Sequence, residues 1–367
     1  MRPMPFALAS ILLLAAACRP AAPLQVGFVA GLSGRVSDLG VSCRNGVQLA
    51  LSERNAAGGV GGRRVELLVE DDAQDPSTAR RAVETLVEAG VVAIIGHATS
   101  SMAEVTLPIA NRRRVLMVSP TVSASQFRRL DDWLVLLYPS TSESAASLAS
   151  YLSRTGSARR MVSLHDLSNQ AFTESWVKHF GTALEAQGGR LLRSVPFRSG
   201  EVTSWDGLVA GALDPSADGL LVVAGALDTA AIFQAARKRS PALRLFGSDW
   251  SATPDVVAHG GAAVEGAVFT QKVDLEDTSP SYQRFRASYE ERFRRPVDFG
   301  AVMAYEAATV LFAALERDAS REGVRREILR AGSVAGLQGP LVIDANGDAQ
   351  RQHRVMLVRG GKLLRAE

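Results

Sequence analysis

From residue 24 onward, short apolar runs alternate with stretches in which apolar residues recur at helical spacing. In order along the chain, the first strands and helices are expected at 24–29, 45–54, 64–70, 78–89, 91–95, 102–111 and 115–118. Strands that alternate with helices in this way form parallel sheets covered by helices on both faces. The pattern therefore predicts an α/β fold with a doubly wound sheet.

The same alternation begins again near Ser142. Further strands and helices are expected at 143–154, 160–164, 174–187, 190–195, 205–213, 219–223, 229–239, 244–246, 267–270, 279–293 and 299–314. One sheet seldom holds so many units, and 367 residues suffice for two domains, so we expect two α/β lobes. Near the end, 341–343 and 355–358 flank Asn346-Gly347, which predicts a hairpin between these two runs.

The N-terminus resembles an export signal. Arg2 precedes an apolar run, 6–14, that is shorter than the ~20 residues a membrane-spanning helix needs. Small residues then lead into Cys18, as in the lipobox of bacterial lipoproteins, so we expect a signal peptide over 1–18, acylation of Cys18 and a tether over 19–23. Ala15 departs from the lipobox, which leaves cleavage without lipidation as the alternative.

Charge and cysteine content narrow the possible partners. The chain has 41 basic and 38 acidic residues, spread without long blocks of one sign, so nucleic-acid binding is not expected. After cleavage at Cys18, Cys43 is the only other cysteine, and an internal disulfide is not expected.

The chain does not match the sequence motifs that we considered for catalysis or for metal or cofactor binding. The Gly-rich segment 58–62 follows a helix and lacks the ending of a phosphate-binding loop. The five histidines have no metal-binding spacing, and 31–34 does not have the spacing of a hydrolase nucleophile. We therefore expect no enzyme activity, no cofactor and no metal.

Two polar loops follow adjacent strands of the first lobe. Thr99–Ser101 leads into a helix, and Thr121–Ser123 follows the strand at 115–118. In open α/β sheets, ligands lie beyond the carboxyl ends of the strands, and hydroxyls and free N–H groups at a helix N-terminus favour an anion such as a carboxylate. Plain helix capping by these Ser and Thr residues is the alternative interpretation.

Several segments together resemble the branched-chain amino acid class of ABC-transporter substrate-binding proteins. They fall in the order and spacing of that family and are Gly31–Gly34, Asn55–Val60, Glu70–Pro76, Ile94–Ser101, Val118–Ser123 and Phe246–Trp250, with Asp344–Asp348 resembling its C-terminal turn. The resemblance extends over essentially the whole mature chain. It implies a type I periplasmic-binding-protein fold, in which three crossovers join two lobes around a ligand cleft.

The resemblance also implies how the chain divides. Lobe 1 is expected to contain 24–141 and 273–347, and lobe 2 to contain 142–272 and 348–367.

Matching positions in the family suggest the ligand contacts. By this resemblance, Ser100, Thr121 and Ser123 would hold a ligand carboxylate and amine, and Asp249 would face a ligand ammonium. A charge buried alone would cost several kcal/mol, so an ammonium requires such a partner. Solvation or capping of Asp249 is the alternative.

The side-chain pocket departs from the family. Gln170 stands where leucine-binding relatives often have Tyr, and Leu39 replaces a common aromatic residue. Leu39, Phe172 and Trp250 are expected to line the pocket with apolar surface.

The resemblance implies a periplasmic or cell-surface protein, anchored by its lipid, that binds a small carboxylate-bearing ligand by hinge closure and delivers it to an ABC-transporter permease. An amino acid is the expected ligand. The alternatives are an aromatic or aliphatic carboxylate, an amide or urea, or a role as the ligand-sensing module of a signalling system.

Overall fold

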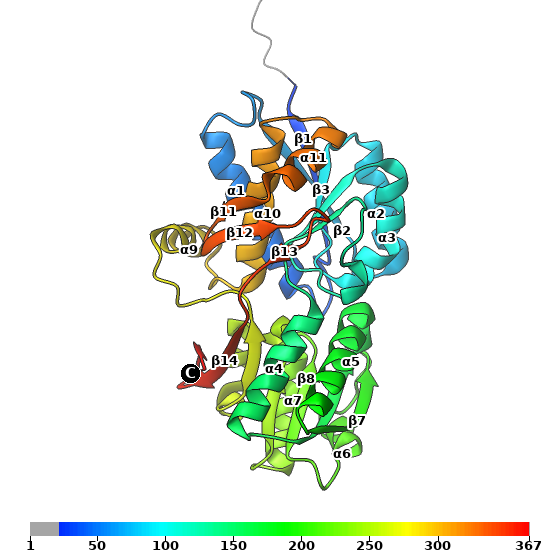
Figure 1. Ribbon diagram of the computed structural model, residues 1–367, viewed down its shortest axis with the longest axis vertical. Helices are drawn as coiled ribbons and strands as arrows, with labels where there is room; N and C mark the ends of the chain where they lie inside the picture. Colours follow the sequence, from blue (N-terminus) through cyan, green and yellow to red (C-terminus); the bar gives the residue numbers. More distant parts are fainter. Residues whose placement is uncertain (1–21, 367) are drawn as a thin grey trace, which may run out of the picture.

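A computed structural model describes residues 22–366 (Figure 1). The predicted signal peptide with Cys18, and most of the predicted tether, lie outside the described residues. The described part has two α/β lobes, one above the other in the view of Figure 1. This architecture confirms the predicted fold class.

The upper lobe is built on a five-stranded sheet in the order β2-β1-β3-β4-β5, and all neighbouring strands are parallel. Its strands are β1 (Leu24–Ala30), β2 (Val65–Asp71), β3 (Ala93–Gly96), β4 (Leu116–Ser119) and β5 (Leu134–Leu136). Every residue of β3 and β4 is buried, as expected for central strands with helices on both faces. The helices are α1 (Asp38–Ala56), α2 (Pro76–Glu88), α3 (Ser100–Arg113), α9 (Pro280–Phe293), α10 (Phe299–Leu315) and α11 (Arg321–Ala331).

The lower lobe is built on a seven-stranded sheet in the order β15-β14-β10-β9-β8-β6-β7. Its strands are β6 (Arg160–Asp166), β7 (Arg190–Phe197), β8 (Gly219–Val223), β9 (Arg244–Gly247), β10 (Val268–Gln271), β14 (Arg354–Arg359) and β15 (Lys362–Arg365). The last two are antiparallel and the others are parallel. The helices are α4 (Thr141–Thr155), α5 (Gln170–Ala186), α6 (Trp205–Ala212), α7 (Ala226–Arg239) and α8 (Pro254–Gly260).

The chain passes between the lobes three times, after β5, after β10 and after β13 (Ala349–Gln350) (Figure 1). Hydrogen bonds tie the three passages together. The Tyr138 hydroxyl of the first donates to Gln271 Oε1 of the second at 3.0 Å, and Arg351 Nε of the third donates to the Leu137 carbonyl at 3.4 Å. The connection is therefore a cross-linked three-segment hinge.

The predicted terminal hairpin is wrong in its pairing. β12 (Gly339–Ile343) pairs with β11 (Ser333–Gly336) and with β13, and these three strands form a small antiparallel sheet. β14, predicted as the second arm, instead pairs with β10 in the lower lobe. The turn at Asn346-Gly347 closes a hairpin whose returning strand has only two residues, after which the chain leaves for the other sheet.

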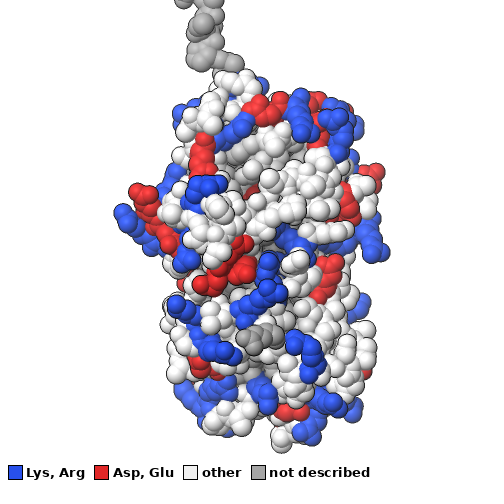
Figure 2. All heavy atoms as spheres, turned by 60° about the vertical axis from the view of Figure 1, so that its left-hand side comes forward, with Lys and Arg blue, Asp and Glu red and all other residues white. Residues whose placement is uncertain are grey.

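Charged side chains of both signs are scattered over the face shown in Figure 2, on both lobes, among larger areas of other residues. Within residues 22–366, no helix is both long and apolar enough to cross a bilayer.

Candidate functional site

The carboxyl ends of strands from both sheets meet around a small cavity between the lobes. Its lining residues follow β1, β3 and β4 of the upper lobe and β6 and β9 of the lower lobe, with additions from the first hinge passage and from α10. The cavity volume is about 20 Å³, which is room for roughly one water molecule. The lining residues are Leu39, Ala98, Thr121, Ser123, Tyr138, Asn169, Phe172, Asp249, Trp250 and Phe299.

Six of the eight predicted ligand-binding residues line this cavity, namely Leu39, Thr121, Ser123, Phe172, Asp249 and Trp250. They come from both lobes, although more than 200 residues separate Leu39 from Trp250 along the chain. Sequence reasoning did not select the other four lining residues, which are Ala98, Tyr138, Asn169 and Phe299. Tyr138 lies in a hinge passage and Phe299 begins a helix that returns from late in the chain, so neither follows a strand that was expected to end at the site.

Ser100 and Gln170 lie elsewhere. Ser100 is the first residue of α3, and its Oγ accepts hydrogen bonds from the backbone N–H groups of Ser123 and Ala124, both at 3.3 Å. It therefore supports the loop that carries Ser123 and does not itself line the cavity. Gln170 lines an outer groove, where its Nε2 donates to Glu174 Oε1 at 3.0 Å.

The loop after β4 carries one hydroxyl that donates a hydrogen bond within the protein and one that has no hydrogen-bond partner among the described residues. Thr121 Oγ1 donates to the Ala98 carbonyl at 2.6 Å. Ser123 Oγ, by contrast, has no hydrogen-bond partner among the described residues, although Ser123 is only 1% exposed. A buried hydroxyl without a partner loses its bonds to water with no replacement, so Ser123 is a ready donor for a ligand.

Aromatic side chains form much of the remaining wall. Phe172 and Trp250 meet edge to face with ring centroids 5.9 Å apart, and Tyr138 lies 5.7 Å from Phe299. The Trp250 indole N–H is buried and, like the Ser123 hydroxyl, has no partner within residues 22–366. The wall is thus apolar apart from a few polar groups, as is usual in small-molecule sites.

Asp249 lines the cavity, but other residues of the chain already occupy both of its carboxylate oxygens. Lys272 Nζ donates to Oδ2 at 2.9 Å, Ser144 Oγ donates to the same oxygen at 3.2 Å, and Trp176 Nε1 donates to Oδ1 at 3.2 Å. The predicted contact between Asp249 and a ligand ammonium stays a prediction. The structure adds a partner that the sequence did not suggest.

Lys272 is buried behind Asp249, directly after β10. Its ammonium lies 4.9 Å from the centroid of the Tyr138 ring, and it also donates to Ser144 Oγ. Burial lowers the pKa of Lys272, and the neighbouring Asp249 carboxylate opposes that shift. Lys272 is one of only four lysines in a chain rich in arginine, and this rarity is the one sequence signal that sets it apart.

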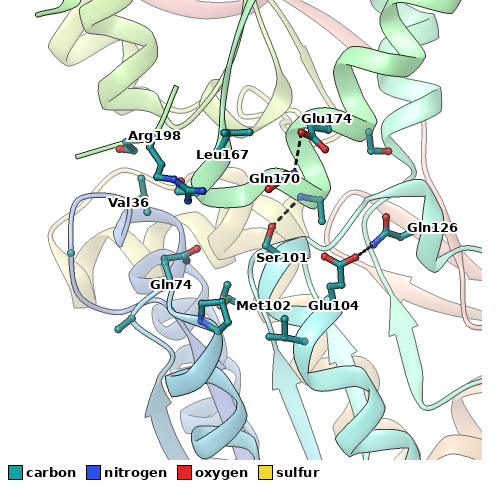
Figure 3. A pocket seen from close by; sticks show the side chains of 18 of the residues that line it. Val36, Gln74, Ser101, Met102, Glu104, Gln126, Leu167, Gln170, Glu174 and Arg198 are labelled. Atoms are coloured by element: carbon teal, nitrogen blue, oxygen red, sulfur yellow. Dashed lines mark hydrogen bonds between the residues drawn. The ribbon is translucent and has the colours of Figure 1, made fainter. Parts of the chain in front are cut away.

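A larger groove of about 1030 Å³ opens outside the cavity. Figure 3 shows Leu167, Gln170 and Arg198 of the lower lobe facing Gln74 and Met102 of the upper lobe across this groove.

Two hydrogen bonds between the lobes connect the groove with the cavity. Ser101 N donates to Asn169 Oδ1 at 3.1 Å, and Ala171 N donates to Ser101 Oγ at 3.0 Å. Ser101 lines the groove and Asn169 lines the cavity, so these bonds join the walls of the groove and of the cavity.

An ion pair also bridges the lobes. Arg35, in the loop after β1, contacts Asp228 Oδ1 through Nε at 2.8 Å and through the second guanidinium nitrogen at 2.6 Å. The guanidinium carbon lies 5.7 Å from the centroid of the Trp205 ring. Asp228 is 1% exposed, so this pair holds a buried acid of α7 against the upper lobe.

Residues 23–362 match the family described as periplasmic binding protein. The chain belongs to this family. A Leu/Ile/Val-binding protein from Escherichia coli strain K12 is 23% identical over 326 residues, covering 89% of this chain and 88% of that protein. A leucine-, isoleucine-, valine-, threonine- and alanine-binding protein from Pseudomonas aeruginosa is 25% identical over 338 residues, covering 89% and 87%. The predicted resemblance to branched-chain amino acid binding proteins is confirmed.

Solved structures of other periplasmic binding proteins share the fold. A leucine-binding protein from Thermotoga maritima has a TM-score of 0.85 at 25% identity, covering 94% of this chain and 98% of that one. A solute-binding protein of an ABC transporter from R. palustris, in complex with benzoate, also has a TM-score of 0.85, at 18% identity over 94% and 95%. The type I fold of this chain is thereby confirmed.

Proposed function

We propose that this family member is an extracytoplasmic solute-binding protein of an ABC importer that binds a small carboxylate between its lobes and does not transform it. The observation that carries the proposal is the buried Ser123 hydroxyl, which has no partner within residues 22–366, in an aromatic-lined cavity at the ends of strands from both sheets. Relatives named for leucine, isoleucine and valine, and a structure in complex with benzoate, support a carboxylate, which all these compounds contain.

Hinge closure is the proposed mechanism. The cavity in this structure has a volume of about 20 Å³, so an amino-acid-sized ligand needs the lobes to separate and then close again around it. A ligand that contacts both lobes stabilises the closed form by what it gains over contact with one lobe alone. The permease would then recognise the closed form.

The moving bodies are proposed to be 24–141 with 273–350 and 142–272 with 351–367. The last boundary moves from 347 to 350 relative to the sequence-based proposal, because β13 pairs with β12 of the upper lobe.

Acylation at Cys18, which would tether the protein to the membrane beside its permease, also stays a proposal. Mass spectrometry of the mature N-terminus tests it.

A thermal-shift and calorimetric screen tests the binding function. Leucine, isoleucine and benzoate, together with leucinamide and urea as ligands without a carboxylate, would be titrated into the protein. A ligand selective for the native state raises the melting temperature, and we expect this only for carboxylates. Ser123→Ala should weaken that binding about tenfold, the effect of losing one good hydrogen bond. Ser150→Ala, on the exposed face of α4, is the matched control.

A further inference from the structure

The ion pair between Asp249 and Lys272 bears on which carboxylate the cavity accepts. We infer that the cavity selects a carboxylate without an ammonium group, and that Lys272 sets this preference by neutralising Asp249. The inference rests on the proposed function and narrows its ligand class.

The charges beneath the cavity disfavour a ligand ammonium. Asp249 is the only acidic residue in the cavity lining, and it lies 2.9 Å from the Lys272 ammonium. The side chains of both residues are nearly completely buried, at 2% and 0% exposed. A ligand ammonium placed here would lose its water beside a carboxylate whose charge is already balanced. It would also lie close to the like charge of Lys272, which further disfavours it.

The hydrogen-bonding groups of the cavity also favour a ligand oxygen over a ligand ammonium. The three groups that donate to Asp249 come from Lys272, Ser144 and Trp176, and they engage both carboxylate oxygens. Among cavity-lining residues, the buried side-chain atoms without partners in the described chain are the Ser123 hydroxyl and the Trp250 indole N–H. Both can donate a hydrogen bond, and the indole can only donate. The site therefore offers unpaired donors to a ligand oxygen, whereas its one carboxylate already accepts from three groups and already has a cationic partner.

The apolar wall of the cavity also bears on the ligand class. Leu39, Phe172 and Phe299 surround the cavity with apolar surface, which suits a hydrocarbon or aromatic body attached to the carboxylate. An aliphatic or aromatic acid satisfies the donors and the wall together. An amino acid would leave its ammonium without a free counter-charge.

The test compares two ligands that share one carbon skeleton, leucine and 4-methylpentanoate, which lacks the ammonium. Calorimetric titration of the wild type should show 4-methylpentanoate bound at least about tenfold more tightly than leucine. Lys272→Met frees Asp249 to pair with an ammonium, so the ratio should shift towards leucine by about tenfold or more. Lys238→Met replaces an exposed lysine and should leave the ratio unchanged.

Lys272→Met leaves a buried acid without its partner and is at risk of misfolding. The double variant Asp249→Asn, Lys272→Met removes both charges, so the ligand preference can be measured even if the single variant does not fold. Its readout is the ratio of the two affinities, which should show no gain for leucine because the variant has no carboxylate at position 249 to pair with an ammonium.

The possible failures can be told apart. Tighter leucine binding by the wild type, or a ligand ratio that Lys272→Met does not change, would overturn the inference while leaving the proposed function intact. A wild type that binds neither compound nor benzoate would overturn the proposed function, and the inference with it.

Discussion

Lys272 and Asp249 form an ion pair inside the protein, with Nζ 2.9 Å from Oδ2 and almost no exposure of either side chain. Removing one partner of such a pair leaves an uncompensated buried charge, whereas replacing both with apolar residues is often neutral. Asp249→Ala should therefore lower the free energy of unfolding by about 3–5 kcal/mol. Chemical denaturation followed by circular dichroism measures this change.

The double variant Asp249→Leu, Lys272→Met is the companion to that experiment. It leaves no buried charge, although the Trp176 and Ser144 donors lose their acceptor, so its loss of stability should be well below the sum of the losses in the two single variants. Additive losses would contradict the pairing. Because Asp249→Ala is expected to be destabilised, a loss of ligand binding in this variant can be assigned to a lost ligand contact only after its stability has been measured.

Ser123 and Thr121 allow binding and stability to be separated. Ser123→Ala removes a hydroxyl with no partner in the described chain, so stability should be unchanged or slightly higher while affinity falls. Thr121→Val removes the bond to the Ala98 carbonyl and should lower stability by about 1 kcal/mol. Thermal melts with and without 4-methylpentanoate check both. A large destabilisation by Ser123→Ala would show that its hydroxyl is structural.

The alternation of strands and helices could be predicted from the sequence because it depends on local apolar spacing, which is visible without knowledge of tertiary contacts. α11 was not predicted because most of its residues are charged, and the apolar side chains it buries are only Val324 and Ile328. β14 was placed with the wrong partner because strand pairing over long distances depends on which sheet edge is open, here that of β10.

The residues of the site divide in the same way, into those that a local sequence pattern reveals and those whose role depends on tertiary contacts. Thr121, Ser123, Asp249 and Trp250 follow predicted strands, and the family resemblance pointed to them. Lys272 also follows a strand, but its role depends on burial against a carboxylate 23 residues away, and no local pattern shows that.

Arg35 should stabilise the closed arrangement of the lobes. Its loss leaves Asp228 buried without its cationic partner, and the lobes can relieve this by opening so that Asp228 regains water. Arg35→Ala should weaken 4-methylpentanoate binding about 3- to 30-fold, with little effect on the unfolding of either lobe. Arg190→Ala, at an exposed position in β7, is the control. Unchanged affinity in Arg35→Ala would exclude a closing role.

Asp38, the first residue of α1, should give the protein a specific pH dependence. Burial raises its pKa to about 6, with a further contribution from the negative charges of Asp298 and Asp255. Because the native pKa lies above the unfolded value of 3.8, the stabilisation is complete below pH 3.8 and is lost as the pH rises through 6.

Asp38→Asn keeps a neutral side chain at every pH, which turns this shift into a measurable difference. The variant should melt roughly 2–5 °C above the wild type at pH 7.5 and close to it at pH 4. Melting curves of both proteins across this range check the prediction. An equal difference at both pH values would show that Asp38 carries no such shift.

Small-angle X-ray scattering with and without ligand tests the central claim, that two lobes close around a carboxylate. The protein would be measured alone, with saturating 4-methylpentanoate and with saturating leucine. The account predicts a smaller radius of gyration with whichever compound gives calorimetric heat, and in Ser123→Ala the same change only at about tenfold higher ligand concentration. Measurable heat with an unchanged radius in the wild type would contradict it.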